Sequence, residues 1–378
     1  MNDAYCPLPF KHAYVDNSGV SACCVSPRYK IPLRDWASSK PLIEMQQRIL
    51  NNEVPDSCKI CHSNEKTFNE SLRTAALRNY NKQVFTESDI DFVDYRSSNI
   101  CNFKCRSCSP TFSHGIAHEA KNTPGLQRYF NICPDAKTLS LAEEDQQWVW
   151  DNLDRIKRLM LTGGEPTMIP RIKDIVNLIA EKYADKIQLL ITSNLSFSDP
   201  LWYKITTTMP NIHWTASIDA VGEAAEIIRH GTDWSTVEQN LNWLAINAPS
   251  LNINTVVTNL SLFQLGQVLV LGREMQKKSI QPSSRHGTDG CRHQFAILPV
   301  GNMLAVDNLP PELAEKALPY LHSCLELDLD TEQKDTVNGL IERLKNYKFN
   351  PVLWDKFKHY NKTLDGLRGE NYKKLFPQ

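Results

Sequence analysis

Residues 99–110 read NICNFKCRSCSP, which places cysteines at 101, 105 and 108 in the spacing C-x3-C-x2-C. Three thiolates are one too few to close a tetrahedral metal site or to give a [4Fe-4S] cluster four cysteine ligands. A cluster bound by Cys101, Cys105 and Cys108 would keep one iron open, and an open position lets a metal site react. Spacing alone also permits a zinc site or three structural thiols.

The segment before these cysteines, Asp89–Tyr95, alternates polar and apolar residues, as strands do. From there on, strand and helix patterns alternate along the chain. We expect further strands at 158–161, 187–191, 213–218, 251–257 and 295–298, and helices at 172–183, 201–208, 234–248 and 263–275. This alternation predicts a parallel sheet whose polar groups follow the strand ends. The predicted fold is α/β, a partial (β/α)6 TIM-like barrel with a helical C-terminal tail at 310–324 and 331–347.

Polar residues follow several of the predicted strands: Thr162–Pro166 (TGGEP), Ser193-Asn194, Ser217-Ile218-Asp219 and, further on, Arg229. Two glycines in the first motif let a ligand approach the backbone, and the Glu165 carboxylate can accept hydrogen bonds from an ammonium group. The guanidinium fork of Arg229 suits a carboxylate. Simpler interpretations are a tight turn at Glu165, a helix cap at Ser193-Asn194 and a surface cation at Arg229.

The three-cysteine loop after a first strand, together with the later TGGEP turn, resembles the radical S-adenosylmethionine enzymes. The resemblance implies a [4Fe-4S] cluster on Cys101, Cys105 and Cys108, with the methionine part of S-adenosylmethionine on the open iron. An electron would cleave a C–S bond of the cofactor, and the resulting 5′-deoxyadenosyl radical would abstract a hydrogen from the substrate. The chain departs from the family at Ser107, where a large residue usually contacts the adenine.

The same resemblance assigns contacts to the cofactor. It implies that the GGEP motif binds the amino group of S-adenosylmethionine, through Gly163, Gly164, Glu165 and Pro166. It places Ser193-Asn194 in a T-N motif that reaches the ribose or the carboxylate. Ser217 and Asp219 match an S-x-D motif, and Arg229 matches the arginine that binds the carboxylate. No catalytic residue is assigned.

A second cysteine group lies in residues 1–88 and comprises Cys6, Cys23, Cys24, Cys58 and Cys61. We expect a hairpin here, with strands at 12–16 and 20–22 around the turn residues 17–19, and a helix over 41–50. A hairpin followed by a distant C-x2-C pair brings four thiolates together, which suits either zinc or an iron–sulfur cluster. Residues 62–88 are interpreted as a polar connector that includes a helical segment at 71–80.

This arrangement resembles the twitch (half-SPASM) module of radical S-adenosylmethionine enzymes, which binds one auxiliary [4Fe-4S] cluster. Here the module precedes the barrel, as in a twitch-containing subgroup whose LDxxRG ending resembles residues 363–372. The resemblance implies four ligands: Cys6, Cys23 or Cys24, Cys58 and Cys61. We favour Cys23, because the strand is expected to end there and successive side chains of a strand face opposite ways.

Composition narrows the function further. The formal net charge is −1, from 42 Lys and Arg against 43 Asp and Glu, which does not predict nucleic acid as a partner. No apolar run approaches the roughly 18 residues that a membrane span needs. The start, MNDAYCPLPF, lacks the basic and apolar regions of a signal peptide, so we expect a cytoplasmic protein. In that reducing compartment, 11 cysteines favour metal or cluster binding over disulfides.

We therefore expect three domains: an auxiliary-cluster module at 1–88, a barrel at 89–304 and a helical extension at 305–378. The expected activity is that of an oxidoreductase or a peptide-modifying enzyme, acting on a peptide or a small metabolite with a reductant such as flavodoxin or ferredoxin. The polar loop at 281–293 could contact the substrate. The alternative hypothesis is a non-catalytic metal-binding interaction protein on a degenerate barrel. The sequence names neither the substrate nor the oligomeric state.

Overall fold

The computed structural model describes residues 2–68, 71–130, 138–279 and 290–377. Positions 281–289 of the polar loop lie outside the described residues. Contacts group the chain into two compact units. The first unit comprises Met1–Ile100, Thr138–Ile191 and Thr208–Ile212, and the second comprises Cys101–Lys137, Thr192–Thr207 and His213–Gln378. The three domains expected from the sequence stay a prediction.

The strands of the first unit follow the order β6-β5-β3-β1-β2. They are β1 (His12–Asp16), β2 (Gly19–Ser21), β3 (Phe92–Tyr95), β5 (Arg158–Leu161) and β6 (Gln188–Ser193), the last two residues of which belong to the second unit. The predicted hairpin is confirmed by the antiparallel pairing of β1 with β2. Strands β3, β5 and β6 pair in parallel, as predicted, and β1 pairs in parallel with β3. The alternating apolar residues of β5 and β6 are fully buried: Leu159, Leu161, Leu189 and Ile191.

Strand β1 pairs in parallel with β3, with His12 opposite Phe92. A hairpin from residues 1–88 thus continues the strands that begin after residue 89. The sequence did not predict this pairing, because neither strand carries a local signal for its partner. Two residues after β2, the Cys23-Cys24 pair lies in a turn closed by the bond from Ser26 N–H to Cys23 O, 3.1 Å. The strand argument for choosing between the two cysteines therefore does not apply.

Helices of the first unit are α1 (Leu8–Lys11), α2 (Leu33–Trp36), α3 (Lys40–Leu50), α4 (Lys59–Phe68), α5 (Leu72–Asn79), α7 (Glu143–Asp151) and α8 (Pro170–Lys182). Helices α3, α5 and α8 confirm predicted segments within two residues. Helix α5 starts where Ser71 accepts the N–H of Thr74 in a capping box. Helix α4 was not predicted, because its polar residues after Cys61 resemble a connector. The short helix η1 (Asp56–Cys58) precedes α4.

The second unit contains three parallel strands in the order β10-β9-β7 and a small antiparallel pair, β4-β8. Their bounds are β4 (Lys104–Cys105), β7 (Ile212–Ser217), β8 (Arg229–His230), β9 (Ser250–Val257) and β10 (Gly290–Ile297). Strands β7 and β9 lie within one residue of their predicted bounds. Strand β10 begins five residues before its predicted start, because buried Cys291 and His293 alternate with polar residues that hide the apolar pattern. Closure of the strands into a partial barrel stays a prediction.

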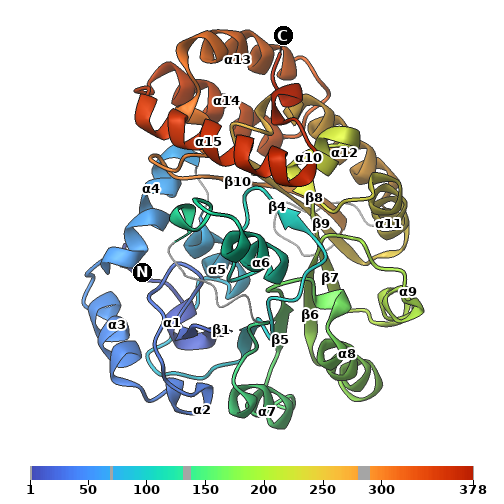
Figure 1. The fold of residues 1–378 in the computed structure, drawn as a ribbon. Coiled ribbons are helices and arrows are strands. Elements are labelled where there is room, and N and C mark those ends of the chain that lie inside the picture. The colour runs from blue at the N-terminus through green and yellow to red at the C-terminus, as the bar shows by residue number, and fades with distance from the viewer. Residues whose placement is uncertain (1, 69–70, 131–137, 280–289, 378) are drawn as a thin grey trace. The chain divides into compact units, whose positions relative to one another are not determined.

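Eight α-helices lie in the described part of the second unit: α6 (His114–Asn122), α9 (Pro200–Thr208), α10 (Gly222–Ile228), α11 (Trp234–Asn247), α12 (Leu265–Lys278), α13 (Pro311–Cys324), α14 (Thr331–Lys345) and α15 (Pro351–Arg368). The predicted helical C-terminal part is confirmed. Figure 1 shows α13, α14 and α15 gathered together. Buried residues of α12, α13 and α14 form one apolar cluster, which includes Leu269, Leu321 and Leu340. Helices α6, α10 and α15 were not predicted.

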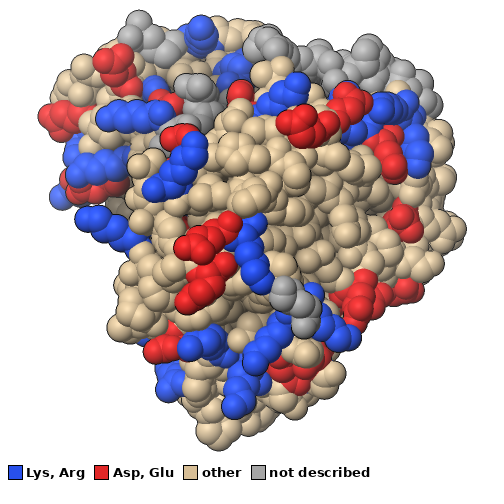
Figure 2. Space-filling model, turned by 90° about the horizontal axis from the view of Figure 1, so that it is seen from above, with Lys and Arg blue, Asp and Glu red and all other residues tan. Residues whose placement is uncertain are grey.

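Charges of both signs are mixed on the surface. On the face shown in Figure 2, Lys and Arg lie beside Asp and Glu around a central area with few charges. Such mixing agrees with the formal net charge of −1. Within the described ranges, none of the helices combines the length and the apolar character needed to cross a lipid bilayer.

Candidate cofactor and cluster sites

The three-cysteine loop belongs to the second unit and is held by backbone hydrogen bonds. Cys105 is buried, whereas Cys101 and Cys108 are partly exposed. The N–H of Cys108 donates to Cys105 O at 3.1 Å, and the N–H of Phe103 donates to Cys101 Sγ at 3.4 Å. A loop with two partly exposed thiols leaves room for a bound group.

Arg229 lies opposite Cys105 in the antiparallel pairing of β4 with β8. The N–H of Arg106 extends this pairing by donating to Ile228 O at 2.9 Å. Burial raises the pKa of the Cys105 thiol, and the positive charge of Arg229 partly offsets the rise. The register thus brings a guanidinium to the loop that carries the three cysteines.

Asp219 holds the Arg229 side chain in place. Arg229 Nη1 donates to Asp219 Oδ2 at 3.0 Å, and Asp219 Oδ1 accepts the N–H of Val256 at 2.8 Å. Burial alone would lower the pKa of Arg229, but the negative charges of Cys105 and Asp219 outweigh it, so the pKa is raised. Arg229 Nε is buried and has no hydrogen-bond partner among the described residues. A buried donor of this kind can serve a ligand that accepts hydrogen bonds.

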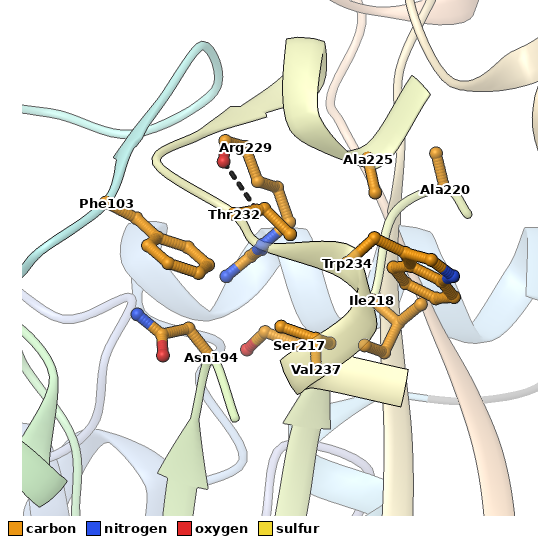
Figure 3. A pocket seen from close by; sticks show the side chains of 10 residues that line it. All are labelled: Phe103, Asn194, Ser217, Ile218, Ala220, Ala225, Arg229, Thr232, Trp234 and Val237. Carbon is orange, nitrogen blue, oxygen red and sulfur yellow. Dashed lines mark hydrogen bonds between the residues drawn. The ribbon is translucent and has the colours of Figure 1, made fainter. Parts of the chain in front are cut away.

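Arg229 lines a small pocket, and Figure 3 shows the side chains that line it. Its polar neighbours are Asn194 and Ser217, and the ring of Phe103 lies 5.9 Å from the guanidinium carbon. The apolar side is formed by Ile218, Ala220, Ala225, Trp234 and Val237. The empty space in this pocket is about 180 Å³, which includes open solvent at its mouth. This is below the roughly 300 Å³ of common small-molecule sites, so it suits one part of a larger ligand.

Asn194 connects the end of β6 to the three-cysteine loop. Its Nδ2 donates to Asn102 Oδ1 at 2.9 Å, and Asn102 Nδ2 in turn donates to Ser196 Oγ at 2.9 Å. Ser193 is buried, and its Oγ accepts the N–H of Leu195 at 2.9 Å. Leu195 itself has a φ of 61°, a left-handed conformation that is uncommon for leucine.

The sequence interpretation missed Asn102, Phe103 and Trp234 as residues of this region. Asn102 and Phe103 stand inside the cysteine motif, in which the three thiols are the recognisable signal. Trp234 follows the Arg229 segment by five positions and carries no motif of its own. Their polar or aromatic character beside a predicted ligand-binding motif was the available signal.

The TGGEP turn belongs to the first unit and follows β5. The N–H of Gly164 donates to Ser98 O at 3.0 Å, and the N–H of Glu165 donates to Ile100 O at 2.7 Å. A Cβ on Gly164 would lie 1.9 Å from Ile100 O, so only glycine fits at this position. Pro166 begins the short helix η3 (Pro166–Met168). The turn is thus bonded to the residues that immediately precede Cys101 in the sequence.

Glu165 is buried at the end of this turn, with 1% of its surface exposed. Its Oε1 accepts hydrogen bonds from Thr167 Oγ1 at 2.7 Å and from Thr167 N at 3.3 Å. Gly163 has a φ of 110°, which lets the chain reverse before the carboxylate. A carboxylate fixed in this way is oriented before any ligand arrives.

Four of the five N-terminal cysteines lie close to one another in the first unit. Burial is the main cause of the raised pKa of Cys6, and three neighbouring thiols add to it: Cys23, Cys58 and Cys61. Cys6 and Cys23 share a buried cluster with Leu8 and Ala76. Burial and the nearby thiols raise the pKa of Cys58 to about 11. Cys24, in contrast, is exposed.

Each of these four sulfurs has a nearby hydrogen-bond donor. Backbone N–H groups serve Cys6 and Cys61, from Leu8 and Arg73 respectively. Hydroxyl groups lie beside the other two: Ser26 Oγ is 3.1 Å from Cys23 Sγ, where either atom can donate, and Ser57 bonds to Cys58. Such donors stabilise negative charge on sulfur. As the side chains stand, no group of three or more His, Cys, Asp or Glu residues within the described ranges converges to hold a single metal ion.

Comparisons with known proteins give structural neighbours only. No protein-family model and no curated protein matches the chain. Among solved structures it resembles native anSMEcpe with bound AdoMet, at 18% identity over 65% of this chain and 61% of that one, with a TM-score of 0.40. It also resembles Streptococcus suis SuiB bound to S-adenosylmethionine, at 16% identity over 78% and 60% of the two chains, TM-score 0.40.

A third neighbour is TsrM of Kitasatospora setae, a radical S-adenosylmethionine methyltransferase with cobalamin and a [4Fe-4S] cluster bound. It is 10% identical over 60% of this chain and 37% of that one, with a TM-score of 0.36. The chain thus spans less than two thirds of the length of these neighbours. The argument for function rests on the residues of the chain itself.

Proposed function

We propose that the chain is a radical S-adenosylmethionine enzyme with two [4Fe-4S] clusters. One observation carries the proposal: Arg229 lies opposite Cys105, lines a pocket with Asn194 and Ser217, and has a buried Nε without a hydrogen-bond partner among the described residues. A ligand with a carboxylate would satisfy this donor. S-adenosylmethionine has such a carboxylate.

Three thiolates on one loop fit a cluster with one open iron, and we propose Cys101, Cys105 and Cys108 as its ligands. The bound cluster would supply the electron that cleaves S-adenosylmethionine to a 5′-deoxyadenosyl radical, which abstracts a substrate hydrogen. The chain's own contribution is to hold the thiolates and to orient the cofactor. Arg229 favours the thiolate form of Cys105, because its positive charge opposes the rise in pKa caused by burial.

In this proposal each candidate residue has its own role toward the cofactor. Arg229 would bind the carboxylate, with Asp219 fixing the guanidinium. Asn194 and Ser217 would donate to or accept from the ribose hydroxyls, since both line the same pocket. Glu165 would accept the ammonium, a role that its burial and its fixed orientation support. We propose Gly163, Gly164, Pro166 and Ser193 as the residues that shape these contacts.

The second cluster is proposed for the N-terminal cysteines, with Cys6, Cys23, Cys58 and Cys61 as ligands. Support comes from the mutual electrostatic interactions of these four thiols and from the donor beside each sulfur. Cys24 is left out because it is exposed. Residues 1–88 would then form the twitch-like auxiliary module that precedes the radical S-adenosylmethionine domain at 89–304.

We further propose a peptide or a small metabolite as the substrate, and a low-potential electron donor such as flavodoxin or ferredoxin as the reductant. Cluster-based radical chemistry requires a reducing environment, which agrees with a cytoplasmic location. The reaction would be a net oxidation or a cross-link, in which the second cluster binds the substrate or accepts an electron.

Anaerobic reconstitution followed by reduction tests the proposal. We expect the reduced protein to bind S-adenosylmethionine and to release 5′-deoxyadenosine slowly without substrate, as measured by liquid chromatography. Iron and acid-labile sulfide, measured on the same sample, separate this function from that of a zinc-binding interaction protein. A protein with two intact, reduced clusters that forms no 5′-deoxyadenosine would not be an enzyme of this kind.

A further inference from the structure

Arg106 stands between the second and third cysteines, and its side chain is completely buried. Its guanidinium donates through Nε to Ile227 O at 3.0 Å and through Nη1 to Asn361 Oδ1 at 2.9 Å. Nη2 pairs with two carboxylates, Asp365 at 2.5 Å and Glu370 at 2.6 Å. A charge buried this deeply persists only when its partners are fixed, so the loop and these partners are held together.

Glu370 also reaches the strand that carries Arg229. Its Oε1 lies 2.5 Å from Nδ1 of His230, the residue after Arg229, while its Oε2 accepts from Arg106, the residue after Cys105. One carboxylate therefore bridges the neighbours of two residues that face each other across β4 and β8. This bridge joins the same two strands that the backbone pairing joins.

A second contact fixes the other side of Cys105. Lys104 Nζ donates to Glu119 Oε1 at 2.6 Å, and Arg368 Nη2 donates to Glu119 Oε2 at 2.7 Å. Both Glu119 and Arg368 are buried, with side chains 9% and 2% exposed. Residues 104 and 106 are thus both tied to the segment 365–370, the first through Glu119 and the second directly.

The end of α15 supplies these contacts. Gly369 adopts a left-handed φ of 66° and donates its N–H to Asp365 O, which ends the helix and turns Glu370 back toward the strands. Asp365 also accepts the N–H of Tyr372 at 3.0 Å. These residues belong to the L-D-x-x-R-G ending noted in the sequence. Its residues Asp365, Arg368 and Gly369 each make one of the contacts described above.

We propose that Asp365, Arg368 and Glu370, at the end of α15 and directly after it, form a clamp that holds Cys105 and Arg229 in register. The inference rests on the proposed function: the clamp would set the cysteine loop and the carboxylate-binding arginine in register for S-adenosylmethionine. Asp365 and Glu370 are positioning residues, since their contacts run through Arg106 and His230. Replacing a residue that supports a metal ligand commonly lowers metal affinity or activity by roughly 10–100-fold.

Glu370 variants test the clamp in the full-length, anaerobically reconstituted protein. Glu370→Ala removes both contacts, and Glu370→Gln keeps the size but removes the charge that balances Arg106. Glu223→Gln is the matched control, because Glu223 forms an exposed pair with Lys374 at 2.6 Å in the same unit. We expect the Kd for S-adenosylmethionine to rise about tenfold in Glu370→Ala, less in Glu370→Gln, and not at all in the control.

The spectroscopic readout is the electron paramagnetic resonance signal of the reduced cluster. In wild type this signal should change when S-adenosylmethionine is added, and in Glu370→Ala the change should be diminished. Glu370→Ala could instead lower the Tm while keeping wild-type affinity and the wild-type change in the signal. Glu370 would then be a stabilising residue only, and the clamp would be wrong. If Glu370→Ala does not fold, Glu370→Gln decides: faster hydrogen exchange at the Arg106 amide supports the clamp, and wild-type exchange rejects it.

Failure of the proposed function gives a different result. Wild-type protein would then bind no S-adenosylmethionine at all, whatever residue stands at 370. The exchange of the Arg106 amide would still report whether Glu370 holds the loop, because its bond to Ile228 O exists without the cofactor.

Discussion

Cys105 and Arg229 face each other across the antiparallel strands β4 and β8. Backbone hydrogen bonds set the two residues opposite each other, and Glu370 contacts the residue that follows each of them, Arg106 and His230. Asp219 then orients the guanidinium and leaves Nε without a partner among the described residues. This relationship links a sequence motif at 101–108 to one that lies more than a hundred residues later.

Arg229→Ala should weaken the binding of S-adenosylmethionine by about 1.5–3 kcal/mol, roughly 10- to 150-fold, the usual size for a hydrogen bond to a charged group. Arg229→Lys should weaken it too, because an ammonium keeps the charge but loses the planar fork. Isothermal titration under anaerobic conditions measures both values. Arg273→Ala is the control, since Arg273 pairs with exposed Asp328 in the same unit.

Loss of Arg229 also leaves Asp219 buried without its cation, so Arg229→Ala should lower the Tm. Cluster content must therefore be measured on every sample. Wild-type affinity in both Arg229 variants, at normal iron content, would show that the cofactor carboxylate binds elsewhere.

Iron analysis should find about eight irons per chain, from two [4Fe-4S] clusters. Triple replacement of Cys101, Cys105 and Cys108 by alanine should leave about four. The remaining four would belong to the N-terminal thiols. Zinc in place of iron in this triple variant would contradict the auxiliary cluster.

The adjacent cysteines should behave unequally. Cys23→Ser should lose the spectrum of the auxiliary cluster, because Cys23 is buried with Cys6 in the group of interacting thiols. Cys24→Ser should retain it, because Cys24 is exposed. Absorption and iron content of both variants, prepared in parallel, check this prediction. Equal loss in both would mean that the turn after β2 rearranges when the cluster binds.

The sequence predicted well those elements whose pattern of buried residues depends only on the segment itself. Strands β5 and β6 bury every second residue, and α8 and α14 bury one face, so their periods can be read without knowing their neighbours. Helix α15 was missed because its start, Asn350-Pro351, resembles a loop. The pairing of β1 with β3 was missed because the sequence of a strand does not identify the strand with which it pairs.

The candidate site likewise has residues that the sequence predicted and contacts that it could not predict. Asn194, Ser217 and Arg229 were proposed from motifs, and all three line one pocket in the second unit. The contacts of Arg106 could not be predicted, because its partners Asn361 and Glu370 are 255 and 264 positions away in the sequence. Long-range polar contacts have no periodic signal. The cofactor roles of all these residues stay predictions.

Stability should depend on pH through His293, which is buried in the second unit. Burial lowers the pKa of His293 to about 3, and its Nε2 lies 2.9 Å from Thr255 Oγ1. In the unfolded chain its pKa is about 6.5. Between about pH 6.5 and 3 the unfolded chain therefore binds a proton that the folded protein does not. The free energy of unfolding should fall with decreasing pH, by up to about 1.4 kcal/mol per unit.

His293→Gln removes this group while keeping a polar side chain beside Thr255 and Gln333. Its stability relative to wild type, measured by urea unfolding, should improve as the pH falls from about 7.5 to about 5. Other titrating groups act on both proteins and cancel in the difference. A difference that stays constant over this range would show that the pKa of His293 is the same in the folded and the unfolded protein.

Gly164→Ala should disrupt the turn that carries Glu165. A Cβ at 164 would lie 1.9 Å from Ile100 O and 2.5 Å from Ile100 C, and backbone atoms cannot rotate away as a side chain can. Residues 98–100 would have to shift, which breaks the bond from Glu165 N to Ile100 O. We expect a loss of stability of at least about 2 kcal/mol, a size typical of steric overlap in a packed region.

Gly366→Ala is the matched control, because Gly366 is exposed within α15 and a Cβ there would meet nothing within 4 Å. That variant should be neutral or more stable by up to about 1 kcal/mol, since alanine favours the helix. Affinity for S-adenosylmethionine should fall in Gly164→Ala and stay unchanged in Gly366→Ala. Because Ile100 directly precedes Cys101, Gly164→Ala should also lower the iron bound by the three-cysteine loop. A variant with normal Tm, iron content and affinity would show that the turn does not pack against Ile100.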